Sequence, residues 1–524
     1  MKAVNKSKLV LMVVGVIMLI ALAWPLARPV LSPHVAHAAG EQAKAALTSG
    51  SAVERTPQDM QRDALKPFPK PAHGVIPFRP TMNISQYQQA KAQAAAQRGP
   101  HRQGAPTTTP AVSLIKSFDG ASDVDGLVPP DTHGAASKTQ FVETTNSHLD
   151  IYQKSSPSTH TSKSLASFFG YFTETIFDPR VLYDSTWNRW IVTAEASPES
   201  STLQRQFIAI SKTASATGSF FIYNFNVTFF TGDFWDFPQV GMDQDAVIMT
   251  ANVFNSSNAF KGADCFAVAK ARLYNGLGFS VPVFTGLVGT LAPSVVLDQN
   301  PKTFLIAAQP SGSTLQLYSM TNTSRPAGTT LTLQANVPVP AYSVPPSAPQ
   351  PGVSCPTFCL DTSDSRFENY GTQVGDFLWQ VHTVAFGTAT PKYYEINTAT
   401  NSVIQSSFFF VSGTSSDFNA SLVANSTNDM YVTWSSTNPS AGINAQVRFS
   451  SCNHTSACAP GAGLAMFTSS NPLTSDFDPR FGEQRWGDYS AVTVDPSNSL
   501  RAWLVNEKVN PGGDWGSRIG QISL

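Results

Sequence analysis

The hydrophobic pattern from about residue 111 to the C-terminus is that of short β-strands separated by polar turns. Apolar and polar residues alternate over a few positions at a time, and Val, Ile, Thr, Phe and Tyr recur in these stretches, as is typical of strands. No long stretch in this region has the period of an amphipathic helix. The pattern therefore predicts an all-β fold.

A repeated unit organises these strands. Each unit opens on a polar or Pro-containing corner, and two or three apolar strands follow it. The corners stand at Asp131, Asp178, Asp236, Pro293, Arg366, Asp417 and Arg485. Their spacings are 47, 58, 57, 73, 51 and 68 residues, and a four-stranded propeller blade needs about 40–50 residues before insertions. Seven such units predict a seven-bladed β-propeller, because radial packing buries both faces of every sheet.

The last unit is one strand short of a blade, since only RIGQISL follows its strand RAWLVNEKV. An unassigned strand, Val112–Phe118, lies upstream of the first corner. We expect it to pair with Arg518–Leu524, to complete the last blade and to close the ring. The corner spacing is irregular, so six or eight blades are alternatives, and a pair of β-sandwiches is the rival architecture.

The N-terminus has the features of an export signal. Three lysines precede an apolar run from Leu9 to Ala27, and Ala36-His37-Ala38 fits a small-residue cleavage site. The sequence therefore predicts a signal peptide over residues 1–38. An uncleaved anchor is the alternative, because a run of about 19 residues nearly spans a bilayer. Both interpretations place the remaining chain outside the cytoplasm, in the extracellular space or at the cell surface, and only the anchor would contact a membrane.

Residues 39–110 differ in composition from the rest and are rich in Ala, Gln and Pro. Such a composition predicts a flexible linker, with a short helix over Ser85–Gly99. The propeller domain then covers residues 111–524.

Charge and cysteine content narrow the functional classes. Only 13% of the residues are charged, the formal net charge is -1 and no basic block is present, so nucleic acid is not an expected partner. We expect a monomer.

The pairs Cys355/Cys359 and Cys452/Cys458 are close enough for local disulfides in an oxidising compartment, and a metal site is the less favoured interpretation. Cys265 belongs to neither pair and is expected to be a buried thiol.

The corners hold the candidate ligand-binding residues, because residues before the first strand of each blade gather at one mouth of the central channel. The acidic candidates could form a ring that holds a cation or polar ligand groups, while each of them alone could simply cap its own turn. Basic and aromatic residues at the same corners complete the set. The candidates are Asp131, Asp178, Arg180, Asp236, Arg366, Asp417, Arg485, Asp488 and Tyr489.

A second acidic stretch, FDGASDVDG, contains Asp119, Asp123 and Asp125. Oxygen-rich loops of this kind bind Ca²⁺. The stretch lacks the Glu of the twelve-residue calcium loop, so a solvated acidic turn is the favoured interpretation. No other cofactor is expected.

Several stretches resemble a family of secreted bacterial propeller-like proteins. LVPPDTHGAASKTQFVETTNSHLDIYQK resembles its opening PPDT-G segment, DPRVLYDSTWNRWIV its second unit, and QPGVSC with LDTSDSR and YYEI its fifth. RWGDYSAVTVDP with WLVNE and WGSRIG resembles its closing blade. The resemblance covers about residues 112–524 and implies a propeller fold and export. Its motifs carry no named reaction, and His133 stands where the family usually has Asn. Sialidase-type propellers are a more distant analogy.

The expected function is non-catalytic binding of a polysaccharide or protein ligand at or outside the cell surface. No serine nucleophile elbow, H-E-x-x-H motif or phosphate loop is present, and the repeated Asp-box of sialidases is absent. A sialidase-like glycoside hydrolase or lyase is the alternative, since arginines, tyrosines and carboxylates stand at the corners. A structural extracellular module is the third hypothesis.

Overall fold

The computed structural model describes residues 40–71, 74–100, 112–296, 298–454 and 458–524. The chain is all-β, with 52% strand and 8% helix. The described residues form one compact unit. The expected signal peptide lies outside the described residues. None of the described helices is both long and apolar enough to cross a membrane.

Antiparallel arrays of four strands make up the fold. The arrays are β5 (His133–Ala136), β6 (Gln140–Thr144), β7 (His148–Gln153) and β8 (Ser156–Ser164); β9 (Ile176–Asp184), β10 (Arg189–Ala196), β11 (Arg205–Ser211) and β12 (Phe220–Asn226); β13 (Phe234–Met242), β14 (Ala246–Phe254), β15 (Phe260–Ala269) and β16 (Phe279–Leu287); β17 (Thr290–Val296), β18 (Thr303–Ala308), β19 (Gly312–Thr321) and β20 (Thr330–Tyr342); β21 (Gly371–Val374), β22 (Phe377–Phe386), β23 (Thr388–Asn397) and β24 (Ser402–Phe408); β25 (Ser416–Ala424), β26 (Met430–Asn438), β27 (Ile443–Cys452) and β28 (Leu464–Thr468); and β31 (Ala491–Val494), β32 (Arg501–Val509), β33 (Trp515–Ser523) and β4 (Ser113–Ser122). A short hairpin, β29 (Phe477–Asp478) with β30 (Glu483–Gln484), precedes the last array.

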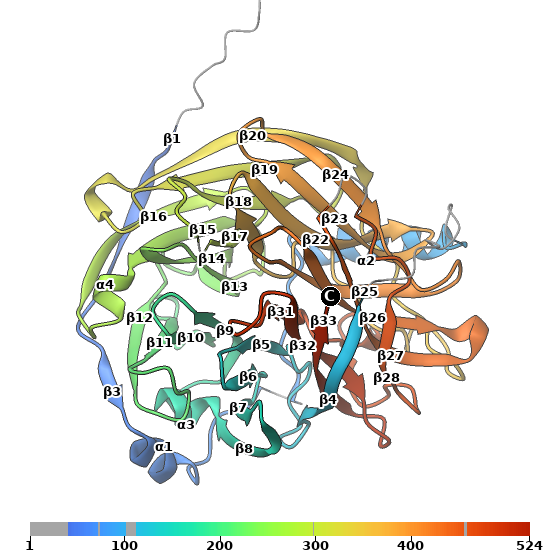
Figure 1. The fold of residues 1–524 in the computed structure, drawn as a ribbon, viewed down its shortest axis with the longest axis horizontal. Helices are drawn as coiled ribbons and strands as arrows, with labels where there is room; N and C mark the ends of the chain where they lie inside the picture. The colour runs from blue at the N-terminus through green and yellow to red at the C-terminus, as the bar shows by residue number, and fades with distance from the viewer. Residues whose placement is uncertain (1–39, 72–73, 101–111, 297, 455–457) are drawn as a thin grey trace, which may run out of the picture. The chain divides into compact units, whose positions relative to one another are not determined.

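The first strand of each array, β5, β9, β13, β17, β21, β25 or β31, is called here its inner strand. Figure 1 shows β5, β9, β13, β17 and β31 near the middle of the view and β8, β12, β16 and β20 further out. Each inner strand packs beside that of the next array, and β31 packs beside both β25 and β5. β17 also pairs in parallel with β13 and β21, which merges three arrays into one 14-stranded sheet.

Apolar side chains fill the spaces between neighbouring arrays. One core cluster joins residues of β6 and β7 to residues of β9–β11, and another joins β5–β7 to β31–β33. Every residue of β14 and β26 is buried. Strands in this position are covered on both faces and are nearly continuous in apolar and small residues, which explains why strict alternation fades there.

The strand upstream of the first corner completes the last array. β4 pairs antiparallel with β33, with Phe118 opposite Ile519 and Leu114 opposite Ile522. The pairing expected for Val112–Phe118 with the C-terminal segment is therefore confirmed. The strand that precedes the first corner and the C-terminal strand therefore belong to the same array.

A β-bulge recurs near the start of three inner strands. The register shifts where Asp178, Phe237 and Asn419 lie, and these residues have φ of 50°, 58° and 50°. A residue in the left-handed region at a bulge bends the strand and turns its side chain to a new direction. Asp131, two residues before β5, has φ of 51°. The repeated corner thus has a common backbone conformation.

The N-terminal segment is built into the fold. β1 (Gly40–Glu41) pairs with β20, β2 (Ala43–Ser49) with β16 and β3 (Val53–Arg55) with β12. Helices α1 (Pro57–Asp63) and α2 (Ile84–Ala96) follow, and α2 confirms the helix expected within Ser85–Gly99. Two further short helices, α3 (Leu165–Phe169) and α4 (Lys270–Leu273), lie between strands. These pairings correct the expectation of a flexible linker for residues 40–71 and 74–100, because outer sheet edges supply backbone partners that composition does not reveal.

The cysteines are arranged as the sequence predicts. Disulfides join Cys355 to Cys359 and Cys452 to Cys458. Cys265 is a buried free thiol in the core. The two disulfides fit an oxidising compartment.

Glu143 lies where the first array meets β4. Its side chain is fully buried, and its Oε2 accepts hydrogen bonds from the Ala121 amide at 2.9 Å and the Tyr152 hydroxyl at 3.3 Å. Burial, reinforced by the negative charge of Asp150, raises the pKa of Glu143 to about 8. The folded protein therefore holds this proton at neutral pH.

Leu47→Ala tests whether the N-terminal strands belong to the core. Leu47 in β2 is 2% exposed and packs in a core cluster with residues of β9–β16, so the substitution should lower the free energy of unfolding by about 2–5 kcal/mol. Urea denaturation measures this change. Leu65→Ala is the matched control, because Leu65 is 95% exposed and its loss should cost less than about 0.5 kcal/mol. Equal stabilities of the two variants would contradict the docking of β2.

Glu143→Gln tests the buried carboxyl at the β4 junction. The unfolded chain loses the Glu143 proton near pH 4.5 and the folded protein near pH 8, so Glu143 lowers stability progressively as the pH rises across this window. Chemical denaturation at pH 5 and pH 8.5 should show wild type and variant similar at pH 5 and the variant more stable at pH 8.5. Glu54→Gln, at an exposed position, should leave the pH dependence unchanged. A wild-type stability loss that persists in Glu143→Gln would contradict the assignment.

Candidate functional site

Four of the five recurrent acidic candidates meet at the N-terminal ends of the inner strands, called here the corner end. The Asp488 amide donates to Asp131 Oδ1 at 2.5 Å. Asn146 Nδ2 donates to Asp131 Oδ2 at 2.7 Å, and its Oδ1 accepts from the Asp178 amide at 2.8 Å. Asp131, Asp178 and Asp488 thus form one hydrogen-bonded group, which Asp236 approaches from β13.

Asp417 does not join this group. Its Oδ1 accepts from Trp434 Nε1 at 2.9 Å and its Oδ2 from Ser415 Oγ at 2.6 Å. The left-handed corner of β25 falls instead on Asn419. The repeat pattern in the sequence therefore predicted this corner two residues too early. Asp417 instead forms hydrogen bonds within its own array.

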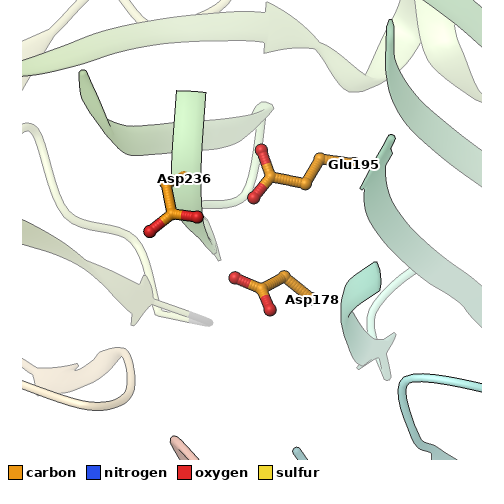
Figure 2. A group of neighbouring side chains, drawn as sticks. All are labelled: Asp178, Glu195 and Asp236. Atoms are coloured by element: carbon orange, nitrogen blue, oxygen red, sulfur yellow. The ribbon is translucent and has the colours of Figure 1, made fainter. Parts of the chain in front are cut away.

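Asp178 and Asp236 face a third carboxylate, Glu195 of β10 (Figure 2). One carboxylate oxygen of each lies within 4.8 Å of the others. Their exposed fractions are 3%, 4% and 0% for Asp178, Asp236 and Glu195. Among the described residues this is the group with the spacing to hold a metal ion. Glu195 was missed in the sequence, although a Glu inside the buried strand WIVTAEA was the available signal.

Burial sets the proton affinity of this group. Burial raises the pKa of Asp178 well above its usual value, and the negative charges of Asp131 and Asp236 add to the effect. Glu195 is raised in the same way by burial and by Asp178 and Asp236, so its pKa is also well above the usual range. Burial raises the pKa of Asp236 too, but Arg79 and Arg366 oppose the shift. Three carboxylates without enough counter-charge must take up either protons or a cation.

Arginines at the corner end are held by local partners. Arg485 pairs with Asp488 at 2.7 Å and donates to the Ile76 carbonyl at 2.8 Å. Arg366 pairs with Asp364 at 2.7 Å. Both guanidinium groups are therefore used inside the protein.

Residues 74–82, called here the N-terminal strap, cover the corner end. Arg79 Nη1 donates to Asp236 Oδ1 at 2.6 Å, the Ile76 amide donates to the Val128 carbonyl at 2.7 Å, and the Thr81 amide donates to Asp364 Oδ2 at 3.2 Å. Phe78 is 2% exposed. The expected acidic ring is present, but the strap separates it from solvent.

A polar plug fills the centre between the inner strands. Asn369 Oδ1 lies 3.1 Å from His133 Nε2 and 3.3 Å from Arg180 Nη1, and its Nδ2 donates to the Ser490 carbonyl at 2.9 Å. The Arg180 guanidinium lies 3.5 Å from the ring centre of Tyr489. Burial and the Arg180 charge lower the pKa of His133 to about 3, so it is neutral. Arg180 and Tyr489, both sequence candidates, are thus parts of a packed network.

The C-terminal ends of the inner strands, called here the cavity end, surround a cavity of about 310 Å³. Every inner strand contributes to its lining. The walls are largely apolar and the rim is polar. The lining includes Ala135, Ala136, Leu182, Tyr183, Met242, Val295, Val374, Val423, Val494, and at the rim Ser185, Asp298, Asn425 and Ser426. Tyr370, which also contacts His133, forms part of the lining next to the plug.

The aspartates of the second acidic stretch have partners within the protein. Asp119 pairs with Arg518 at 2.8 Å and Lys508 at 2.9 Å. Asp123 Oδ1 accepts from the amides of Asp125 and Gly126 at 3.2 and 2.7 Å, as a turn-capping Asp does. The contacts of Asp123 are those of the expected acidic turn, whereas Asp119 lies in β4 and is ion-paired.

No protein-family model matches the chain, and no curated protein sequence does. A protein of unknown function from Dyadobacter fermentans is similar in structure, with 9% identity, a TM-score of 0.39, and coverage of 79% of this chain and 100% of that one. An exo-β-1,3-galactanase from Phanerochaete chrysosporium has 11% identity and a TM-score of 0.31, and the match covers 62% of this chain and 80% of that one. An apocarotenoid oxygenase from Synechocystis has 11% identity and a TM-score of 0.34, and the match covers 61% of this chain and 68% of that one. At these scores, none of these activities transfers to the chain.

Asn369→Ala tests the plug. The substitution removes the hydrogen-bond partner of His133 Nε2 and of the Tyr370 amide, and it takes one hydrogen bond each from Arg180 and the Ser490 carbonyl. It should therefore lower the free energy of unfolding by roughly 3 kcal/mol. Asn471→Ala is the matched control, because Asn471 makes one exposed hydrogen bond, to the Pro511 carbonyl, and should cost less than about 1 kcal/mol. Thermal or urea unfolding measures both. A loss as small for Asn369→Ala as for Asn471→Ala would show that the plug contributes little.

Proposed function

We propose that the protein is an exported, non-catalytic, seven-bladed β-propeller that binds an extracellular protein by taking an apolar side chain of that protein into the cavity. The observation that carries the proposal is the cavity end itself. A cavity of about 310 Å³ is within the size range of ligand sites, which are mostly apolar with a few polar groups at defined places.

The seven-bladed arrangement is part of this proposal. Its support is the order of the inner strands, each packed beside the next, with β31 next to β5. The pairing of β4 with β33 supplies the outer strand of the last array and supports closure of the ring. Membership of the secreted propeller-like family, suggested by the PPDT-G and RWGDYS motifs, belongs to the same proposal.

Export is supported by the signal-like N-terminus in the sequence and by two disulfides. A protein ligand is favoured over a polysaccharide because the apolar part of the lining is mostly aliphatic, with Tyr183 and Tyr370 as its aromatic members. Sugar rings are usually held by stacking on aromatic faces, whereas protein interfaces insert apolar anchor residues into such pockets.

A glycoside hydrolase of propeller type needs its carboxylates within reach of substrate. The converging carboxylates Asp178, Glu195 and Asp236 are buried under the strap. Binding at the cavity end is therefore the better supported function.

Selection of displayed random peptides on the full, disulfide-intact chain tests the proposal. Selected peptides should share an apolar anchor residue and should lose affinity at least about tenfold, or 1.4 kcal/mol, for Thr493→Trp, because Thr493 lines the cavity and the indole would fill it. Thr400→Trp, on an exposed turn between β23 and β24, is the matched control and should bind normally. Isothermal titration calorimetry measures the affinities.

Three results would contradict the proposal. The first is a selection that yields no binder, or binders that Thr493→Trp retains. The second is recognition on a glycan array that Thr493→Trp leaves unchanged, which would favour a glycan-binding surface elsewhere. The third is hydrolysis of glycoside substrates that Asp178→Asn abolishes without unfolding the chain, which would favour an enzyme.

A further inference from the structure

We propose that Asp178, Glu195 and Asp236 bind one hard divalent cation at the corner end, with Ca²⁺ as the ion for an extracellular protein. Figure 2 shows the three carboxyl groups turned toward a common centre. One oxygen of each lies within 4.8 Å of the others. Two oxygens bound to the same Ca²⁺ at about 2.3–2.6 Å lie at most about 5 Å apart, so the spacing fits a single ion.

An unpartnered atom gives a second observation. Glu195 Oε1 has no hydrogen-bond partner, although the side chain is 0% exposed. Glu195 Oε2 accepts from Gln204 Nε2 at 3.3 Å, and the same amide group also donates to the carbonyls of Ala196 and Trp235. The Gln204 side-chain amide group is thus already shared among three acceptors. A buried carboxylate oxygen without a partner is costly, and a bound cation would remove that cost.

The charges around the three carboxylates also favour a bound cation. Arg79 pairs with Asp236 at 2.6 Å. Within the described part of the chain, no ion pair to a basic side chain reaches Asp178 or Glu195. Arg180 and Arg366 act on Asp178 and Asp236 only from further away. A divalent cation would give Asp178 and Glu195 the direct counter-charge that no ion pair among the described residues supplies.

The donor set defines the chemistry of the ion. All three ligands are carboxylates, and neither Cys nor His belongs to the group. Oxygen-only sites select hard cations such as Ca²⁺, Mg²⁺ and Mn²⁺ over Zn²⁺ or copper. Ca²⁺ tolerates irregular geometry, whereas Mg²⁺ demands near-octahedral coordination and keeps several waters, which a site with exposures of 0–4% has little room for.

The elements that carry the ligands explain what the ion would do. The β-bulge of β9 presents Asp178, the neighbouring strand β10 presents Glu195, and β13 of the next array presents Asp236, to which the strap is tied through Arg79. A cation here joins two arrays and the strap. The site is structural and stands apart from the ligand cavity, so it does not depend on the proposed function.

Metal titration of the full, chelator-treated chain tests the site. Calorimetry with Ca²⁺ should give one site per chain, and Ca²⁺ should raise the melting temperature. Glu195→Gln and Asp178→Asn should each weaken Ca²⁺ binding by at least about tenfold, because each removes a charged ligand. Asn tolerates the left-handed φ of position 178, so Asp178→Asn preserves the backbone.

Asp264, which is buried, and Asp123, which lies in the acidic turn, serve as control positions. Asp264→Asn changes a buried carboxyl bonded to Trp235 Nε1, and Asp123→Asn changes the acidic turn. Both variants should bind Ca²⁺ as the wild type does. Binding lost in Asp123→Asn and kept in Glu195→Gln would place the ion elsewhere and overturn the proposal.

The alternative occupant of the site is a proton. In that case millimolar Ca²⁺, Mg²⁺ and Mn²⁺ would all fail to bind, and Glu195→Gln would raise the melting temperature with or without metal, since it removes repulsion between carboxylates. That result would overturn the proposal. If neither variant folds, Tb³⁺ luminescence of the wild type decides: the emission should saturate at one equivalent and be displaced by Ca²⁺, and an absence of such emission would contradict the site.

Discussion

The antiparallel pairing of β4 with β33 is the interaction on which the rest of the structure depends. It joins the strand that precedes the first corner to the C-terminal strand, with Phe118 opposite Ile519. Without β4 the last array would have three strands, and the apolar cluster around Trp503 and Ile519 would lose Phe118, which packs against it. β31 of the same array lies beside β25 and β5. Residues of every inner strand line the cavity, and the plug joins His133 of β5 and Arg180 of β9 to Asn369, just before β21. Both features therefore depend on how the arrays are held together.

The two ends of the inner strands have opposite physical character. At the corner end, bulges and left-handed residues gather carboxylates, and the strap and its Arg79 cover them. At the cavity end, small and aliphatic side chains leave an open volume with a polar rim. The plug around Asn369 separates the two. Charge is thus buried at the corner end, while the walls of the cavity at the other end are largely apolar.

The sequence predicted much of the fold because its local signals are strong. The corners at Asp131, Asp178 and Asp236 precede or begin inner strands, and both disulfides and the β4 pairing were readable from spacing and from an incomplete last unit. The strands β1–β3 were not readable, because short segments in an Ala- and Gln-rich stretch become strands only by adding to distant sheet edges.

The candidate site was predictable only in part. The aspartates at the corners were found, but their burial by the strap depends on contacts such as Arg79 with Asp236, which are 157 residues apart in sequence. The sequence around Glu195 and around Asn369 carries no distinctive pattern. Their roles depend on side chains that are distant in the chain, such as Asp236 for Glu195 and His133 for Asn369. The cavity has no sequence motif, since each inner strand contributes only one to three residues of common types to it.

Hydrogen–deuterium exchange of the full chain, with and without a peptide selected for binding, tests the central claim most directly. The peptide should slow exchange at residues 182–185, 423–426 and 493–499, which contribute to the cavity end, and should leave residues 76–82 and 485–489 unchanged. Slowed exchange confined to the strap and the corner end would contradict it and would place ligand recognition at the buried carboxylates.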